Sequence, residues 1–339
     1  MLWLAWRQFR SQAVVAGAAL AAAAIALALT GVHLAALYRD SGLATCTTAC
    51  GQPTAAFTYD VRSSGGQAIF YAGVVVLYLI PALAGIFWGA PLITREFESG
   101  TLSLAWNQSV PRTRWAVVKL GFVGLAALAA SGLLSLMLTL WSRPIYAAAA
   151  KANNPSLPFG RISPLYFGAG GIVPAGYAVF AFALGVSVGV LVRRTIPAMA
   201  LTLAVFAAVQ VLMPMLIRPH LAPPVRTTYA LAAVSFSATG DSNGRLILAA
   251  AELPGQRGGW ILSQRPVDTR GHVVTQAPQA CNAQPAAFLQ CLSGRGIRLS
   301  ITYQPASRYW EFQWIETGIF LVLATGLGGL CYLRVRRPS

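Results

Sequence analysis

The segment 94–119 combines charged and apolar side chains in a way that suits docking onto another surface. It carries two of the nine acids in the chain, Glu96 and Glu98, together with four bases. Ser99-Gly100 interrupts a helix here, and Thr101 can cap a new one. The apolar side chains that follow are Leu102, Leu104 and Trp106. A short amphipathic helix of this kind buries its apolar side against the membrane surface or against a protein partner, and both alternatives are open at this point.

The cysteines offer a second kind of chemistry, because paired thiols can form disulfides. Four of the five lie in two polar segments, as Cys46 and Cys50 and as Cys281 and Cys291. We predict the disulfides Cys46–Cys50 and Cys281–Cys291, which match an oxidising exterior. The alternative is four free thiols. We expect no metal site, because none of the three histidines has ligand spacing beside it.

The lysines argue against a nucleotide-hydrolysing site. The chain contains only Lys119 and Lys151, and neither follows a glycine. A phosphate-binding P-loop requires G-x-x-x-x-G-K-[ST], in which the lysine reaches the nucleotide phosphates. We therefore predict that the chain is not itself an ATPase and holds no cofactor of its own.

These residues must be positioned by helices in a membrane, because the composition leaves too little polar surface to face water. Of the 339 residues, 56% are hydrophobic and 10% are charged, whereas soluble domains carry about 25% charged residues. A membrane-spanning helix needs about 20 mostly apolar residues. Six apolar stretches qualify, centred on 13–33, 68–93, 120–142, 172–192, 195–217 and 313–333. The predicted fold class is an all-α polytopic membrane protein with six transmembrane helices.

The bases predict the orientation of these helices. They gather in short connections on one side, which the positive-inside rule makes cytoplasmic, so that both termini lie inside. These bases are Arg7, Arg10, Arg95, Arg112, Arg114, Lys119, Arg193, Arg194, Arg334, Arg336 and Arg337. The net charge of +16 is scattered at the ends of apolar runs, which favours contact with anionic lipid headgroups and argues against nucleic-acid binding.

The segment 218–312 is the only outer segment large enough for a small extracellular α+β domain, between the fifth and sixth helices. Short strands are predicted at 245–250, 260–264, 272–276 and 297–303, with a helix at 283–292. The rest of the chain divides into 13–217, which holds helices one to five and the loop 94–119, and 313–339, which holds the sixth helix and a basic tail.

The middles of the six stretches contain no Asp, Glu, Lys or Arg. Ionisable residues in a membrane usually serve ions or protons, so their absence argues against a proton-coupled carrier or a selective ion channel. Candidates for the path of a lipophilic or amphipathic cargo are Trp88, Ser135, Thr139, Phe206, Gln210 and Met213. The alternative for the hydroxyl residues is helix packing, and Gly185 and Gly189 indicate close packing within one chain or across a dimer.

The segment 95–119 resembles the signature of the permease subunits of ABC-2-type transporters, which is R-E-x-E-x-G-T-L, then P-x-[ST]-R, then a lysine that opens the next span. The matching positions are Arg95, Glu96, Glu98, Gly100, Thr101, Leu102, Pro111, Arg112, Arg114 and Lys119. Residues 1–12 are similar to the amphipathic elbow helix of that family. The stretch 303–317 resembles a subgroup from high-GC bacteria.

The resemblance implies that two permease chains pair in the bacterial cytoplasmic membrane, as a homodimer. Two copies of a separate ABC ATPase, which hold ATP and Mg, would dock below them. The segment around 99–106 would be the coupling helix, and Glu96 and Glu98 would pair with bases of the ATPase or of the elbow helix. The implied function is outward transport of a drug, an antibiotic or a lipid-like substrate. The long segment 218–312 departs from the family pattern of short re-entrant helices.

Two other classes of function remain as alternatives. One is a membrane-anchored immunity or sensor protein whose segment 218–312 binds a peptide or an antibiotic without transport. The other is an intramembrane enzyme, which is disfavoured because the sequence contains no H-E-x-x-H motif, no intramembrane aspartate pair and no G-x-S-x-G elbow.

Overall fold

The computed structural model describes residues 2–98, 112–151, 160–231, 236–240, 246–250, 253, 258–278, 281 and 288–336. Within these ranges six helices are long and apolar enough to cross a membrane, which confirms the predicted number. The candidate spans are Phe9–Asp40, Gly66–Arg95, Leu120–Trp141, Val173–Val192, Thr195–His220 and Ala306–Arg334. Each coincides with one of the apolar stretches predicted from hydropathy.

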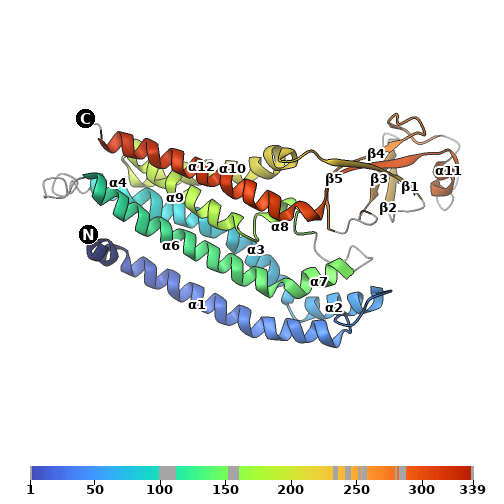
Figure 1. Ribbon diagram of the computed structural model, residues 1–339, viewed down its shortest axis with the longest axis horizontal. Helices are drawn as coiled ribbons and strands as arrows, with labels where there is room; N and C mark the ends of the chain where they lie inside the picture. The colour runs from blue at the N-terminus through green and yellow to red at the C-terminus, as the bar shows by residue number, and fades with distance from the viewer. Residues whose placement is uncertain are drawn as a thin grey trace.

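The helices form an elongated bundle with the strands at one end (Figure 1). They are α1 (Leu2–Asp40), α2 (Gly51–Ser63), α3 (Gly66–Leu83), α4 (Ala90–Glu98), α6 (Arg112–Trp141), α7 (Arg143–Lys151), α8 (Pro164–Phe167), α9 (Val173–Val192), α10 (Thr195–Leu212), α11 (Phe288–Gly294) and α12 (Tyr309–Arg336). Shorter turns are the π-helical η1 (Ala84–Gly89) and η2 (Met213–Ile217) and the 3-10 segments η3 (Arg218–His220) and η6 (Ala306–Arg308).

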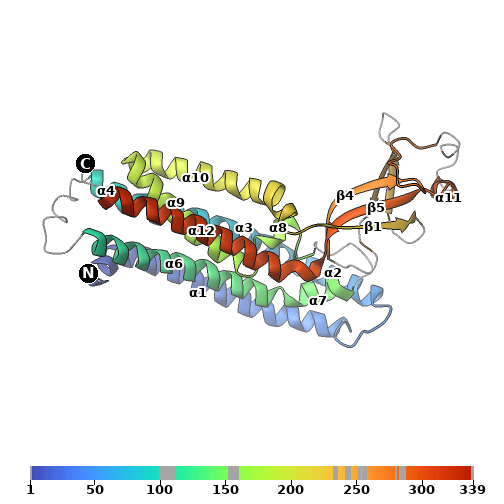
Figure 2. The ribbon, with the colours of Figure 1, turned by 45° about the horizontal axis from the view of Figure 1, so that its top comes forward.

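Figures 1 and 2 define two ends of this bundle. Helix α1 begins, α4 ends, α6 begins and α12 ends at one of them, which we call the terminal end. The opposite end carries the strands and is called the sheet end. The predicted basic side corresponds to the terminal end, because Arg95, Arg193, Arg194 and Arg334 close or open helices there.

Helix α9 is the central helix of the bundle. It packs against α6, α10, α12 and the continuous segment formed by α3, η1 and α4. In its most apolar window 67% of the residues are buried, compared with 0% for the first candidate span and 17% for the fifth. A helix that is apolar all round belongs in such an interior position, whereas α1 and α10 leave wide apolar faces uncovered by the chain.

Two glycines permit the close approach of α9 to the second span. A Cβ atom on Gly185 would collide with the carbonyl oxygen of Gly85, and one on Gly189 would lie 2.8 Å from the carbonyl oxygen of Ala90. Gly85 belongs to η1, which begins three residues after Pro81. Proline lacks the N–H that a regular helix needs, so the hydrogen-bond pattern widens here. Gly185 and Gly189 therefore serve packing within the chain.

Most buried apolar side chains of the bundle fall into two clusters, and a smaller third cluster lies at the terminal end. The α9 cluster joins α9, α10 and α12 and includes Phe180, Phe206 and Phe320. The α6 cluster joins α1, α2, α3, α6 and α7 and includes Phe57, Phe70 and Trp141. Residues 2–12 of the predicted amphipathic elbow helix 1–12 are helical and form the start of α1.

The strands at the sheet end confirm the predicted α+β segment between the fifth and sixth spans. Five strands are present in the described ranges: β1 (Val225–Ala230), β2 (Phe236–Gly240), β3 (Leu246–Ala250), β4 (Trp260–Val267) and β5 (Arg298–Gln304). One antiparallel sheet has the order β1-β5-β4, and β2 pairs with β3. The strands predicted at 245–250, 260–264 and 297–303 are correct. The stretch 272–276 forms an isolated bridge at Val273, and β1 and β2 were not predicted.

Both predicted disulfides are present. Cys46 is bonded to Cys50 beside the start of α2, and Cys281 is bonded to Cys291 in the small core of the sheet region. Cys331 remains as a buried thiol in α12. The disulfide Cys281–Cys291 joins α11 to the segment before it, so it stabilises a region with a small apolar core.

Candidate functional sites at the two ends of the bundle

The predicted coupling segment starts and ends at the terminal end. Arg95 is exposed on the last turn of α4, and Glu98 closes that helix. Gly100, Thr101, Leu102 and Pro111 lie outside the described residues. Glu96 lies in α4, and Arg112 and Arg114 lie in the first turn of α6. The structure describes the backbone of these three residues and not their side chains. Their part in coupling stays a prediction.

Glu98 makes a contact within the chain that the sequence did not indicate. Its Oε1 accepts the backbone N–H of Thr195 at 2.8 Å, and its Oε2 accepts the Thr195 hydroxyl at 2.8 Å. These two bonds hold the pKa of the Glu98 carboxyl below its usual range. Thr94 adds a hydroxyl contact to Thr195 at 2.8 Å. A carboxylate at the first turn of α10 satisfies a free N–H there, so Glu98 ties α4 to α10.

An aromatic cluster lies beside this tie. Phe9 of α1 packs edge-on against Trp88 of η1 at 5.1 Å between ring centroids, and against Phe122 of α6 at 6.0 Å. The cluster continues through buried Phe182 of α9 and buried Cys331. It joins five of the six candidate spans at the terminal end by apolar contacts. Trp88, a predicted cargo-path residue, belongs to it.

The predicted cargo-path residues lie in separate parts of the bundle. Ser135 donates to the carbonyl oxygen of Gly171 at 2.7 Å, and the Thr139 hydroxyl accepts the Gly171 N–H at 3.4 Å. Phe206 and Met213 are buried in the α9 cluster. The hydroxyls of α6 therefore serve helix packing, which was the predicted alternative, and a role of this set in a cargo path stays a prediction.

Gln210 differs from the others because its amide lacks a partner. Its Oε1 and Nε2 are both shielded from solvent and make no hydrogen bond to any described residue. An amide in this situation costs free energy unless another molecule satisfies it. Gln210 lies on α10, whose neighbouring Val211 and Leu212 are exposed. Its part in contact with cargo or with a second chain stays a prediction.

The sheet end holds a buried ion pair that the sequence analysis missed. Arg218 of η3 and Glu316 of α12 are 1% and 0% exposed and form two parallel bonds: Nε to Oε2 at 2.8 Å and Nη2 to Oε1 at 2.9 Å. The Tyr177 hydroxyl of α9 donates to Glu316, and Arg218 Nη1 donates to the carbonyl oxygen of Pro164 at 2.9 Å. The guanidinium also lies 4.4 Å from the ring centroid of Phe167. One bidentate pair thus connects three spans and α8.

Two glutamines extend this polar network. The Oε1 atom of Gln313 accepts the N–H groups of Ile172 at 2.9 Å and Val173 at 3.0 Å, at the start of α9. Gly171, with φ +66°, precedes them, and a Cβ there would lie 2.5 Å from Gln313 Oε1, so only glycine fits. Gln304, at the end of β5, donates to the carbonyl oxygen of Ala222 at 2.7 Å. The network therefore fixes β5 and α12 to the spans.

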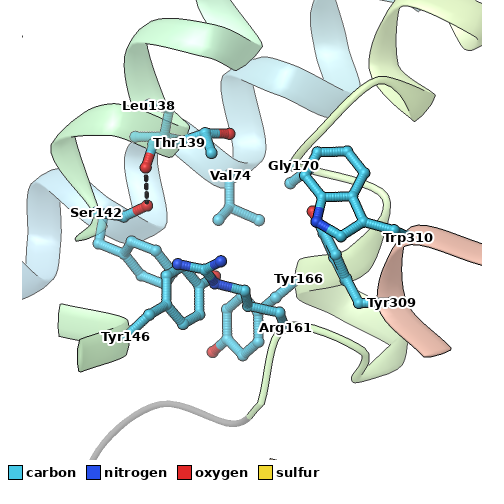
Figure 3. Close-up of a pocket in the computed structure, with 12 residues that line it drawn as sticks. Val74, Leu138, Thr139, Ser142, Tyr146, Arg161, Tyr166, Gly170, Tyr309 and Trp310 are labelled. Atoms are coloured by element: carbon cyan, nitrogen blue, oxygen red, sulfur yellow. Dashed lines mark hydrogen bonds between the residues drawn. The ribbon is translucent and has the colours of Figure 1, made fainter. Parts of the chain in front are cut away.

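A small cavity lies beside this network, at the seam between the α6 cluster and the α9 cluster (Figure 3). Its volume is about 30 Å³, which is room for about two water molecules. The lining residues are Phe70, Val74, Leu138, Thr139, Ser142, Tyr146, Arg161, Tyr166, Ala169, Gly170, Tyr309 and Trp310. Arg161 and Trp310 are the exposed members of this lining. The cavity could not be predicted from the sequence, because the residues that line it come from five separate segments.

A signal for the buried ion pair was present in the sequence. Glu316 interrupts an apolar run close to its start, and Arg218 directly follows another. The prediction considered only the middles of the spans, whereas charges near a span end can be buried as well when they face the bundle. Partner assignment still needed the fold, because the two residues are 98 positions apart.

Comparison with known proteins gives one family match. The family model described as ABC-2 membrane transporter related matches residues 17–218. The match covers the first five spans and ends at Arg218, so the sheet region lies outside it. No curated protein and no solved structure gave a match to the chain.

Proposed function

The chain belongs to the ABC-2 membrane transporter related family, and from this premise we propose that it is the permease subunit of an ATP-driven exporter. The proposal rests on one observation above the others: the matched region carries the coupling signature between α4 and α6, at the same end as both chain termini. An ATPase that docks at this end acts on two spans at once. Two copies of a separate ATPase subunit would bind ATP and Mg, since the chain has no P-loop lysine.

The proposed coupling route runs from the segment 99–111 into four spans. Force on this segment acts directly on α4 and α6, which flank it. Helix α4 passes the displacement to α10 through the bond between Glu98 and Thr195, and to α9 through the close contact of Ala90 with Gly189. Packed helices move as rigid elements, so these contacts spread a local push over the bundle.

We further propose a homodimer in the bacterial cytoplasmic membrane, with the sheet end outside. The disulfides at the sheet end support this orientation, because disulfides persist in an oxidising compartment. The poorly covered apolar face of α10, where Val211 and Leu212 are exposed, supports a second chain or the cargo beside that helix. The cargo would be lipophilic or amphipathic, such as a drug, an antibiotic or a lipid-like molecule.

The first experiment tests the ATPase partner. The tagged chain is purified from native membranes in mild detergent, and the co-purifying ATPase activity is measured for wild type and for Glu96→Ala/Leu102→Ala. We expect the wild type to retain an ATPase and the variant to lose it. Glu311→Ala is the matched control, because it removes an exposed acid at the sheet end.

Thr195→Ala separates docking from internal coupling. It removes the hydroxyl that donates to Glu98 Oε2 and keeps the backbone N–H that donates to Oε1, so the tie loses one of its two bonds. An ATPase that stays bound to this variant but no longer responds to cargo would locate the effect in the tie between α4 and α10. A well-folded wild type that retains no ATPase would contradict the proposed function.

A further inference from the structure

The cavity at the seam of the two clusters combines a polar rim with an apolar floor. Phe70, Val74 and Leu138 belong to candidate spans and form its apolar part. Tyr146 and Arg161 lie outside the spans and contribute polar groups. Figure 3 shows the Arg161 side chain lying across the Tyr146 ring and extending along the cavity. Such a division from polar to apolar matches the two parts of an amphiphile.

Arg161 supplies a positive charge that is not neutralised by an acid in the described part of the chain. Its guanidinium carbon lies 4.5 Å from the ring centroid of Tyr146, in a cation–π contact. No ion pair between Arg161 and a carboxylate is found among the described residues, and the neighbouring segment 152–159 contains no acid by sequence. The cation–π contact orients the guanidinium without using its hydrogen-bond donors on an acceptor.

Residues with neutral hydroxyl groups line the same cavity. Burial raises the pKa of Tyr146 well above its usual value, so that its hydroxyl stays protonated and can donate. The hydroxyl of Tyr309 lies near Gly170, where a Cβ would come within 3.3 Å of it. Ser142 is already bonded to the carbonyl oxygen of Thr139 at 3.3 Å. One charged group with neutral donors beside it is the set that carboxylate and phosphate groups prefer.

We propose that this cavity binds the compact anionic head of an amphiphile, a carboxylate or a phosphate, with Arg161 as the charged ligand. The volume of about 30 Å³ admits part of such a head in place of water, and the rest of the head lies at the rim beside the exposed Arg161. Phe70 and Val74 are buried and form the apolar wall against which the first part of the chain packs. The exposed Trp310 covers the head from the side of α12 (Figure 3). This inference rests on the proposed function, because it makes such an amphiphile the cargo class at the outer end of its path.

Because the cavity lies between the α6 cluster and the α9 cluster, its shape depends on how the two clusters sit relative to each other during transport. Its lining takes Leu138 and Tyr166 from the α6 cluster and Tyr309 from the margin of the α9 cluster. A relative movement of the two clusters changes the width of the cavity, and therefore the affinity for the head. Binding differs between two arrangements only where the contacts differ, as they do at a seam.

The test is a calorimetric titration of the chain in phosphatidylcholine nanodiscs with dodecyl phosphate, with laurate as the carboxylate analogue. Empty nanodiscs give the partitioning background. We expect Arg161→Gln to weaken binding by about 10- to 100-fold, the usual effect of losing charge-assisted bonds. Arg161→Lys keeps the charge and loses the planar fork, so its loss should be smaller. The matched control is Arg143→Gln, an exposed arginine of α7 outside the cavity lining, with affinity unchanged.

Three outcomes would overturn the inference. The first is equal affinity of wild type and Arg161→Gln for dodecyl phosphate. The second is binding of dodecanol as tight as that of dodecyl phosphate, which would remove the need for an anionic head. The third is binding of inorganic phosphate as tight as that of dodecyl phosphate, which would point to a free anion. ATPase retention is measured on the same samples: a retained ATPase without head binding contradicts this inference alone, and head binding without an ATPase contradicts the proposed function.

Discussion

At the sheet end, Arg218 and Glu316 join the fifth and sixth spans through a pair that is 1% and 0% exposed. At the terminal end, the corresponding tie between α4 and α10 uses Glu98, whose carboxyl group is exposed to solvent. Both ties are charged, but solvent screens only the second. Breaking one partner of a desolvated pair is costly, whereas exposed contacts exchange easily with water. The comparison indicates that the sheet end is the fixed end and the terminal end the adaptable one.

Glu316→Gln, at the sheet end, should lower the free energy of unfolding more than any other variant considered. It removes the charge that compensates buried Arg218, and loss of one partner of a buried pair costs about 3–5 kcal/mol. The free energy of unfolding in mixed micelles measures the effect. The double variant Arg218→Met/Glu316→Leu is the control, because it leaves no unpaired charge and should recover most of the stability. A free energy of unfolding equal to that of the wild type for Glu316→Gln would show that the pair does not hold the sheet end.

Cys281→Ser/Cys291→Ser should weaken the sheet region by about 2–3 kcal/mol, the usual effect of opening a loop of this length. The two cysteines are 10 positions apart. Limited proteolysis of the sheet region is the measurement, with Cys46→Ser/Cys50→Ser as the control that should leave its cleavage rate unchanged. Equal protease resistance of Cys281→Ser/Cys291→Ser and wild type would mean that packing alone holds this region.

The hydroxyl groups of Ser131 and Ser135 on α6 should make an intermediate contribution to stability. Ser131 donates to the carbonyl oxygen of Pro174 at 2.8 Å, and Ser135 to that of Gly171 at 2.7 Å. Ser131→Ala/Ser135→Ala should cost about 1 kcal/mol, since bonds between membrane helices average about 0.6 kcal/mol each. Thr325→Ala is the control, because its hydroxyl bonds only within its own exposed helical turn. A loss as large as that of Glu316→Gln would erase the difference between charged and neutral ties.

Glu98→Gln should produce the smallest change in stability. The pKa of Glu98 is lowered below its usual value of 4.5 by the N–H and hydroxyl of Thr195. A group with a lowered pKa in the folded state stabilises above its unfolded pKa, and this contribution is lost as the pH falls through the lowered value. The difference in melting temperature between wild type and Glu98→Gln should therefore be present at pH 7 and vanish in acid below pH 4.5. A difference in melting temperature that grows on acidification would mean that the ionised Glu98 destabilises the folded chain.

The spans and disulfides could be predicted from the sequence because their signals are local. Twenty apolar residues define a span wherever they lie, and Cys46 and Cys50 are close in the chain. Strand β1 was missed although Val225, Thr227 and Tyr229 alternate with residues of a different environment. It directly follows a span and two prolines, Pro223 and Pro224, and such a sequence is typical of a loop.

The candidate site could be predicted only in part. The segment 95–119 was found because its residues are consecutive. Arg161 could not be predicted as a site residue from the sequence. It lines the cavity together with Tyr146 from α7 and Trp310 from a distant helix, and only the fold brings the three together. The pairing of Arg218 with Glu316 likewise depends on the packing of η3 against α12. Contacts between distant segments follow from the fold, and a single sequence carries no direct record of them.

The junction between β5 and α12 makes the fixed sheet end the pivot of the sixth span. Only Pro305 and the single turn η6 separate the two elements, and Arg308 donates to Gln304 across the junction at 2.7 Å. Helix α12 has 28 residues, so its length is about 42 Å at 1.5 Å per residue. A tilt of about 5° therefore displaces one end by about 4 Å relative to the other. Because β5 lies at the fixed end, the displacement appears at the terminal end of α12, and a label on β5 gives the reference against which a label on Arg334 would report it.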